Sequence, residues 1–149
     1  MKVTVAKALK EKSRLAGRIR NLMQVVAKEN SKTEGSTRTV DVRKVYGDVR
    51  QLMERLITIK GRIAEANNSV VAKIVELEEA KSMISLLGQI DTDDSLKYDY
   101  RVERGIKMTA VLSKSEVMME IDALQERANR LQDELDEFNV REKIEIEFN

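Results

Sequence analysis

The sequence predicts a mainly α-helical protein of the α+β class, built on a long antiparallel helical hairpin or coiled coil. A third long C-terminal helix and a small antiparallel β element complete the expected fold. Apolar residues recur at alternating three- and four-residue spacing, which is typical of a coiled-coil seam. The chain has no proline, so long helices stay unbroken. Charged residues form 36% of the sequence, against roughly 25% in average proteins, which favours helices with solvated outer faces.

The length of 149 residues predicts a single domain covering residues 1–149. Within it, a helical hairpin is expected over residues 3–67. The first helix, residues 3–28, has a seam that Lys12 interrupts. This lysine either fixes register or oligomeric state or marks a local fray near the N-terminus. The seam of this helix consists of Val5, Ala8, Leu15, Ile19, Leu22 and Val26.

A polar stretch from residue 30 to 39 separates the first helix from the second and predicts a loop. Asp41 is a favourable N-cap for the second helix, which should end at the turn signal Asn67-Asn68-Ser69. This helix has the most regular seam, formed by Val42, Val45, Val49, Leu52, Leu56, Ile59, Ile63 and Ala66.

A shorter third helix is expected over residues 75–87, with Gly88 as its C-terminal cap. Between residues 98 and 112 the apolar residues then fall on even positions, and this alternation predicts a half-buried strand. The region is either one bulged strand or a hairpin turning near Gly105. Tyr98 and Tyr100 either pack along the edge of this element or mark a binding surface.

Ser113 and Glu116 form a capping-box pattern that starts a long helix over residues 114–140. A terminal strand is expected over residues 143–148. The stretch 36–40 at the tip of the hairpin is its first candidate partner, and a second subunit is the next. The seam of the long helix consists of Val117, Ile121, Leu124, Ala128, Leu131, Leu135 and Phe138.

The composition argues against catalysis. The chain has no histidine and no cysteine, which removes the commonest general base, the commonest metal ligand and all thiol chemistry. The acidic run Asp91 to Asp94 fails as a calcium loop, because Leu96 and Val102 occupy its sixth and twelfth positions. We therefore expect a protein that is not an enzyme, with no catalytic residues, no cofactor and no metal site.

Charge is distributed unevenly along the chain. Residues 1–60 carry 15 Lys and Arg against 6 Asp and Glu, a balance of +9, while residues 61–149 carry 12 against 20, a balance of −8. A basic half can bind nucleic acid, but no recognition helix or stacking aromatic residue accompanies it. A solvated face, or pairing with the acidic C-terminal helix, is the favoured interpretation. The basic residues concerned are Lys7, Lys10, Arg14, Arg18 and Arg20.

The first dozen residues contain no apolar segment typical of a secretory signal. No stretch approaches the roughly 20 apolar residues that span a membrane. A membrane partner is therefore not expected, and the predicted location is cytoplasmic.

The order of these elements resembles the septicolysin-like family of small bacterial proteins. The matching pieces are the turn from Ile63 to Asn68, the strand start Tyr100-Arg101-Val102-Glu103, and the segment from Leu135 to Asn139. The resemblance implies a helical hairpin, a shorter helix, a strand and a long C-terminal helix. By its name the family implies a cytolysin, and it carries over no catalytic residue.

The favoured function is a self-associating scaffold or protein-interaction module. Several narrow seams on one slim chain leave apolar surface that favours a homo-oligomer, and a different protein partner is the second expectation. The alternatives are a membrane-active cytolysin-like protein, a nucleic-acid-binding protein that uses the basic first helix, and a prefoldin-like chaperone. The expected interaction seam consists of Val42, Val45, Val49, Leu52, Leu56, Ile59, Ile63, Val117, Ile121, Leu124, Leu131, Leu135 and Phe138.

Overall fold

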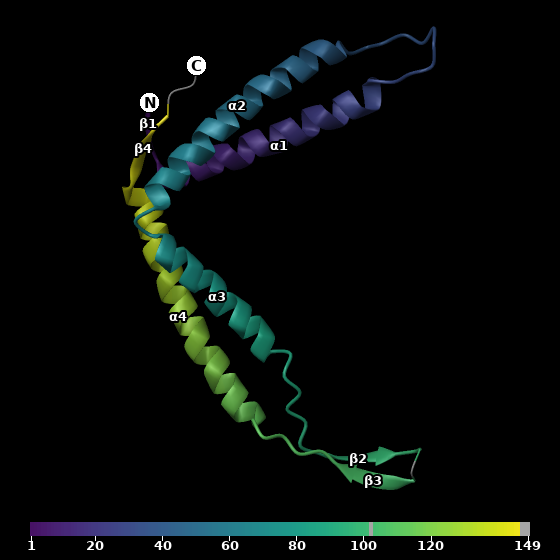
Figure 1. Ribbon diagram of the computed structural model, residues 1–149, viewed down its shortest axis with the longest axis vertical. Coiled ribbons are helices and arrows are strands. Elements are labelled where there is room, and N and C mark those ends of the chain that lie inside the picture. Colours follow the sequence, from purple (N-terminus) through teal and green to yellow (C-terminus); the bar gives the residue numbers. More distant parts are fainter. Residues whose placement is uncertain (102, 147–149) are drawn as a thin grey trace. The chain divides into compact units, whose positions relative to one another are not determined.

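The computed structural model describes residues 1–101 and 103–146 (Figure 1). Helices dominate it and short strands make up two small sheets, so the mainly α, α+β class is confirmed. The length predicted one domain, but the chain divides into two compact units. Unit 1 comprises Met1–Ser69 and Asp136–Asn149, and unit 2 comprises Val70–Leu135.

Unit 1 contains the predicted hairpin of α1 (Val5–Glu29) and α2 (Val42–Asn67). The start and end of α2 match the prediction. Asp41 caps it as expected, because its carboxylate accepts a hydrogen bond from the Lys44 N–H at 3.0 Å. Thr4 caps α1 in the same way, through the Lys7 N–H at 3.2 Å.

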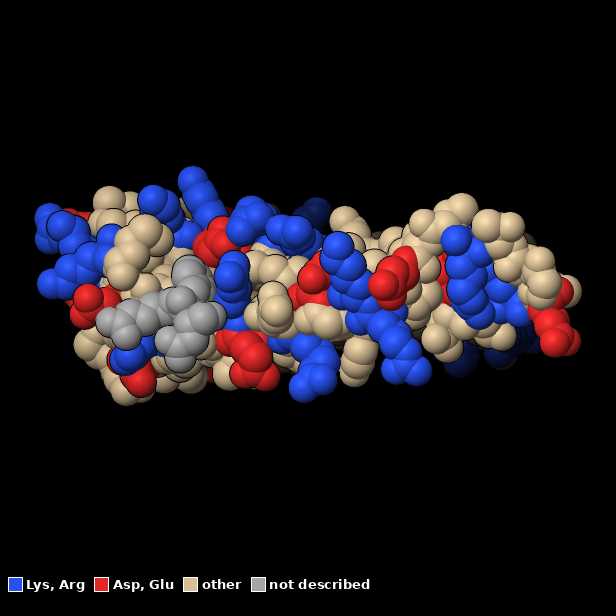
Figure 2. Space-filling view, turned by 90° about the horizontal axis from the view of Figure 1, so that it is seen from above, with Lys and Arg blue, Asp and Glu red and all other residues tan. Residues whose placement is uncertain are grey.

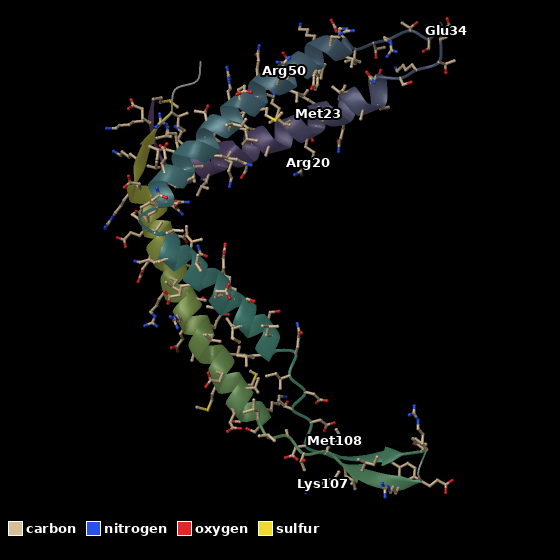
Figure 3. All side chains as sticks on the ribbon, in the orientation of Figure 1. Arg20, Met23, Glu34, Arg50, Lys107 and Met108 are labelled. Carbon is tan, nitrogen blue, oxygen red and sulfur yellow. The ribbon has the colours of Figure 1, made fainter. Side chains whose placement is uncertain are left out.

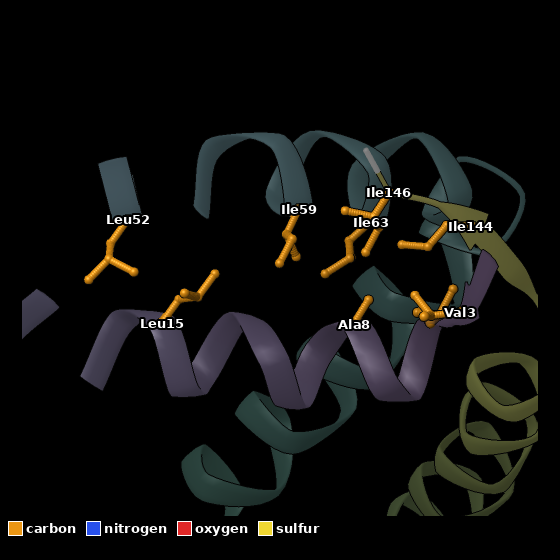
Figure 4. Close-up of a cluster of buried hydrophobic side chains, with 9 residues drawn as sticks. Val3, Ala8, Leu15, Leu52, Ile59, Ile63, Ile144 and Ile146 are labelled. Atoms are coloured by element: carbon orange, nitrogen blue, oxygen red, sulfur yellow. The ribbon is translucent and has the colours of Figure 1, made fainter. Parts of the chain in front are cut away.

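The core of unit 1 lies between these two helices. Leu52, Ile59 and Ile63 of α2 point toward Leu15 and Ala8 of α1 (Figure 4). Ile59 is fully buried. The three- and four-residue spacing of the two seams therefore produces one continuous aliphatic contact along the hairpin.

The two chain ends close the core of unit 1. Strand β1 (Lys2–Thr4) pairs antiparallel with β4 (Lys143–Glu145), with Lys2 opposite Glu145. The proposed partner of the terminal strand, residues 36–40, was wrong, and so was the helical start at residue 3. The loop that contains 36–40 lies at the far end of the hairpin from β1 and β4 (Figure 1). Residues 147–148 of the predicted strand lie outside the described residues.

Alternation explains why these two short strands form. Val3 of β1 and Ile144 of β4 are directly opposite each other and are both buried. Ile146, two residues beyond Ile144, is buried in the same cluster, while Glu145 between them is exposed. The period of two thus places one face of each strand on the core.

Unit 2 contains α3 (Val71–Leu87) and most of α4 (Lys114–Arg141). Helix α3 begins four residues earlier than predicted. At the start of α4 the capping box is confirmed. The Ser113 N–H donates to Glu116 Oε2 at 2.8 Å, and the Glu116 N–H donates to Ser113 Oγ at 3.1 Å. The structure thereby satisfies two of the amide groups that a helix start leaves unpaired.

Of the two predicted forms of residues 98–112, the structure has the hairpin, formed by β2 (Leu96–Asp99) and β3 (Arg104–Lys107). The predicted turn near Gly105 was wrong, because Gly105 lies within β3 opposite Tyr98, and residues 108–112 are not part of a strand. The expectation that this region is half-buried was wrong. All four residues of β3 are exposed, as are Leu96 and Tyr98 of β2. Alternation alone does not distinguish a ribbon that lies on a core from one that extends into solvent.

Candidate interaction surfaces

The predicted seam of α2 is covered within its own unit. Val49, Leu52, Ile59 and Ile63 are buried. The remaining four residues of the seam in this helix, Val42, Val45, Leu56 and Ala66, are half-buried. These side chains therefore form the core of the hairpin.

The seam of α4 is also covered. Val117, Leu131 and Leu135 are buried in unit 2, together with Ala128, and Ile121 and Leu124 are half-buried. Phe138 belongs to unit 1, where it packs against the hairpin cluster. A candidate surface for a partner must therefore come from other apolar residues.

Helix α3 supplies one such surface. Leu77 and Ala80 are buried on the covered side of this helix. On its other side, Val71, Val75 and Leu86 are 50% to 55% exposed. We call these three residues the outer α3 stripe. Apolar residues therefore lie on both sides of α3, and only one of these sides is covered.

The covered face of α3 is aligned with α4 by two ion pairs. Lys73 Nζ lies 2.6 Å from Glu134 Oε2, and Arg127 Nε donates to Glu76 Oε1 at 2.6 Å. Both pairs are about half exposed, so each contributes little to stability. They set the register of the two helices, and they leave the outer α3 stripe free of these contacts.

A second uncovered stripe lies on α2. Tyr46, Met53 and Ile57 are 47% to 57% exposed, and Ala64 is exposed as well. These four residues, the outer α2 stripe, follow spacings of seven, four and seven. Such spacing keeps them on one side of the helix. They lie beside the buried seam and widen the apolar face of α2.

Cations border the outer α2 stripe. Arg50 and Lys60 lie between its members on the same side of the helix, and Arg50 is labelled on α2 in Figure 3. On the face shown in Figure 2, Lys and Arg are more numerous than Asp and Glu. Glu78 and Glu79 instead border the outer α3 stripe. Both stripes therefore consist of apolar residues, but positively charged residues border the outer α2 stripe and negatively charged residues border the outer α3 stripe.

The charged residues that border the two stripes have no ionic partner among the described residues. Within residues 1–101 and 103–146, Arg50, Lys60, Glu78 and Glu79 form no ion pair. By contrast, Arg14 on α1 makes a two-pronged contact with Glu11 at 2.8 and 2.6 Å. That contact lowers the pKa of the Glu11 carboxyl, chiefly through the hydrogen bond from Arg14.

The two units keep opposite charge. Unit 1 has 18 Lys and Arg against 12 Asp and Glu, a balance of +6, and unit 2 has 9 against 14, a balance of −5. Within unit 1 the basic helix α1 packs on α2, which is itself basic. The predicted pairing of a basic with an acidic helix is therefore absent from the described hairpin core.

The predicted basic row lies on the surface of α1. Lys7, Lys10, Arg14, Arg18 and Arg20 are all exposed. The first three border a hollow of about 420 Å³ whose apolar lining includes Met1, Val3, Ala8 and Ile146. A second hollow, of about 670 Å³, lies at the hairpin tip and is lined by residues that include Arg38, Arg43 and Tyr46.

The β2–β3 hairpin is a third exposed surface. The rings of Tyr98 and Tyr100 meet edge to face with their centroids 4.9 Å apart. Tyr100 is 86% exposed, and Leu96 and Ile106 are exposed as well. An isolated two-stranded ribbon is marginally stable in water, so contact with a partner or a surface would stabilise it.

The residues described by the structure contain no group of three or more metal-binding carboxylates. None of their helices combines the length and the apolar character needed to cross a membrane.

Neither outer stripe was predicted from the sequence, although signals for both exist. In α3, apolar residues at 71, 75 and 86 accompany the seam on the opposite side of the helix. In α2, residues 46, 53, 57 and 64 repeat with the period of the seam but shifted around the helix. In each helix the seam repeats more regularly than the outer stripe, so the seam dominates the apolar pattern.

Comparison with known proteins identifies a similar fold but no function. No family model matches the chain, and no curated protein matches it. Among solved structures, it resembles the crystal structure of a functionally unknown conserved protein from Corynebacterium diphtheriae, with a TM-score of 0.79 and 15% sequence identity. The alignment covers 97% of this chain and 100% of that chain. At this identity the likeness establishes a shared fold only.

Proposed function

We propose that this protein is a non-enzymatic scaffold that associates with further copies of itself. The observation that supports the proposal is the second apolar face of α3. Leu77 and Ala80 are covered inside unit 2, whereas Val71, Val75 and Leu86 remain about half exposed.

Burial of this face has a clear driving force. Complete burial of one Val or Leu side chain stabilises by about 1.5–3 kcal/mol. About half of the outer α3 stripe is still exposed, so covering its three side chains gains a few kcal/mol before the cost of association. Exposed apolar side chains gathered on one side of a helix are typical of contact sites.

The charge distribution favours a second copy as the partner. One chain carries a unit of +6 and a unit of −5. Each copy therefore contains both partners of an attractive contact, and such complementarity speeds encounter and fixes orientation.

Native mass spectrometry and light scattering at micromolar concentration test this proposal. We expect species at integer multiples of the 17.0 kDa chain mass, and their share should rise with concentration. Substitution Val75→Asp should lower that share, because it places a charge inside the stripe. Only the single-chain mass across the whole concentration range would overturn the proposal.

The β2–β3 hairpin favours a second candidate function, which is attachment to an anionic membrane surface. Its exposed Leu96, Tyr98 and Tyr100 accompany Arg104 and Lys107, and aromatic and basic residues together suit the membrane–water interface. The resemblance to septicolysin-like proteins adds to this candidate. Co-sedimentation with anionic but not neutral vesicles, weakened by Tyr100→Asp, would support it, and equal recovery without vesicles would refute it.

A further inference from the structure

We infer that self-association occurs head to tail, with the outer α2 stripe of one copy packed on the outer α3 stripe of the next. This inference rests on the proposed function, which requires only that copies associate. It adds the identity of the two surfaces that meet.

The two stripes match in length. At a rise of 1.5 Å per residue, Val71 to Leu86 spans about 22 Å and Tyr46 to Ala64 about 27 Å. Each presents half-exposed aliphatic or aromatic side chains along one side of a helix. Two such helices, packed side by side at the usual 8–10 Å, cover each other over about four turns.

The border charges also match. Glu78 and Glu79 lie at the middle of the outer α3 stripe, equally far from Val71 and Leu86. Arg50 and Lys60 lie on either side of the middle of the outer α2 stripe. When the two stripes are centred on each other, the acidic pair lies between the two cations. The long side chains of Arg and Lys reach across such a spacing while their stems cover apolar surface.

Pairing of like stripes is disfavoured by the same charges. In a two-fold symmetric contact, a stripe meets itself in reverse. An α3–α3 contact would place Glu78 and Glu79 against the same residues of the other copy. An α2–α2 contact would place Arg50 against Lys60. Like charges brought together in an interface are strongly unfavourable, so the mixed contact is preferred.

A mixed contact leaves each assembly with one free α2 stripe and one free α3 stripe. Further copies then add until a ring closes, or the assembly stays an open chain. The stoichiometry of mixtures of variants consequently reports on the surfaces directly.

The test uses two variants of the full chain, Ile57→Asp in the α2 stripe and Val75→Asp in the α3 stripe. Each should be a single chain by native mass spectrometry, because each lacks one half of the contact. Mixed in equal amounts, with one variant isotopically labelled, they retain one intact α2 stripe and one intact α3 stripe. We expect a one-to-one complex of twice the 17.0 kDa chain mass that does not grow further.

Two matched controls carry the same new charge away from the stripes. Gln51→Asp lies on the exposed surface of α2 and Ala123→Asp on that of α4, and both should associate like the wild type. All four variants change exposed positions, and unchanged helical content by circular dichroism verifies their fold.

The alternative outcomes separate the two proposals. If wild-type protein associates and Ile57→Asp associates equally well, the α2 stripe takes no part and the inference is overturned, while self-association stands. The same holds if the two variants do not combine. If the wild type is a single chain at all concentrations, the proposed function fails first.

Discussion

Met1 and Ile146 bind each other through their backbones in both directions, although 145 positions separate them. The Met1 ammonium donates to the Ile146 carbonyl oxygen at 2.9 Å, and the Ile146 N–H donates to the Met1 carbonyl oxygen at 3.0 Å. Next to this contact, Val3 and Ile144 are paired and buried. The two ends of the chain thus complete the core of the α1–α2 hairpin.

Val3→Asp should open this closure. A carboxylate at a buried position without a partner is strongly unfavourable, so β1 should detach from β4. The expected signal is faster hydrogen exchange at the Val5 and Ile146 amides, which donate to Glu142 and Met1. Lys2→Ser, at an exposed neighbouring position, is the control. Unchanged exchange at Ile146 in Val3→Asp would contradict the role given to this pairing.

Ile59→Ala should destabilise the hairpin. Ile59 is fully buried at the contact of α1 with α2, and truncation of a buried Ile to Ala costs about 2–5 kcal/mol. Urea unfolding followed by circular dichroism measures the change. Gln51→Ala, on the exposed face of α2, should change stability by less than about 0.5 kcal/mol. A similar loss in both variants would argue against the described core.

Two glycines should respond to alanine with opposite signs. Gly61 lies within α2, with open space where the Cβ of an alanine would point, so Gly61→Ala should stabilise by up to about 1 kcal/mol. Gly35 has φ of +81° in the hairpin loop, so Gly35→Ala should destabilise by about 1 kcal/mol. Thermal unfolding of the two variants checks the signs. Stabilisation by both would mean that the loop does not require the left-handed conformation.

Glu116 should contribute to the loss of stability in acid. Hydrogen bonds from Ser113 N–H and Oγ–H lower the pKa of this carboxyl. Because its folded pKa lies below the unfolded value, its contribution is present above about pH 4.3 and is lost as the pH falls through the folded pKa. Glu116→Gln keeps a capping side chain that does not titrate, so its stability should vary less with pH in this acidic range.

Urea midpoints between neutral and acidic pH measure this difference. Glu120→Gln is the control, because Glu120 is an exposed residue of the same helix and makes no hydrogen bond through its carboxylate within the described residues. An equal reduction of the pH dependence in both variants would assign the effect to general charge rather than to the capping box.

Local patterns predicted most of the helical structure. The bounds of α2 and the capping box of α4 follow from side chains within a few residues of each end, so the sequence suffices for them. Strand β1 was missed because three residues give almost no periodic signal. Its formation depends on β4, which lies at the other end of the sequence.

The candidate interaction surfaces could be predicted from the sequence less well than the helices. Seam residues such as Ile59 and Leu131 were predicted to be apolar contact positions, and in the structure they are buried within their own units. The outer stripes could be recognised only from the structure, because only the structure shows that the seam positions are already covered. A half-exposed Val75 and a buried Leu77 look alike in sequence, because exposure depends on which neighbour packs against the helix.

The class of the fold, the helices and their caps, and the opposite charges of the two parts of the chain could all be inferred from the amino-acid sequence. These features depend on residues close in sequence or on composition. The pairing of the chain ends, the exposure of the β2–β3 hairpin and the uncovered faces of α2 and α3 became known only from the folded structure. Those outcomes depend on contacts between distant segments, because a side chain's burial is fixed by what packs on it and not by its identity.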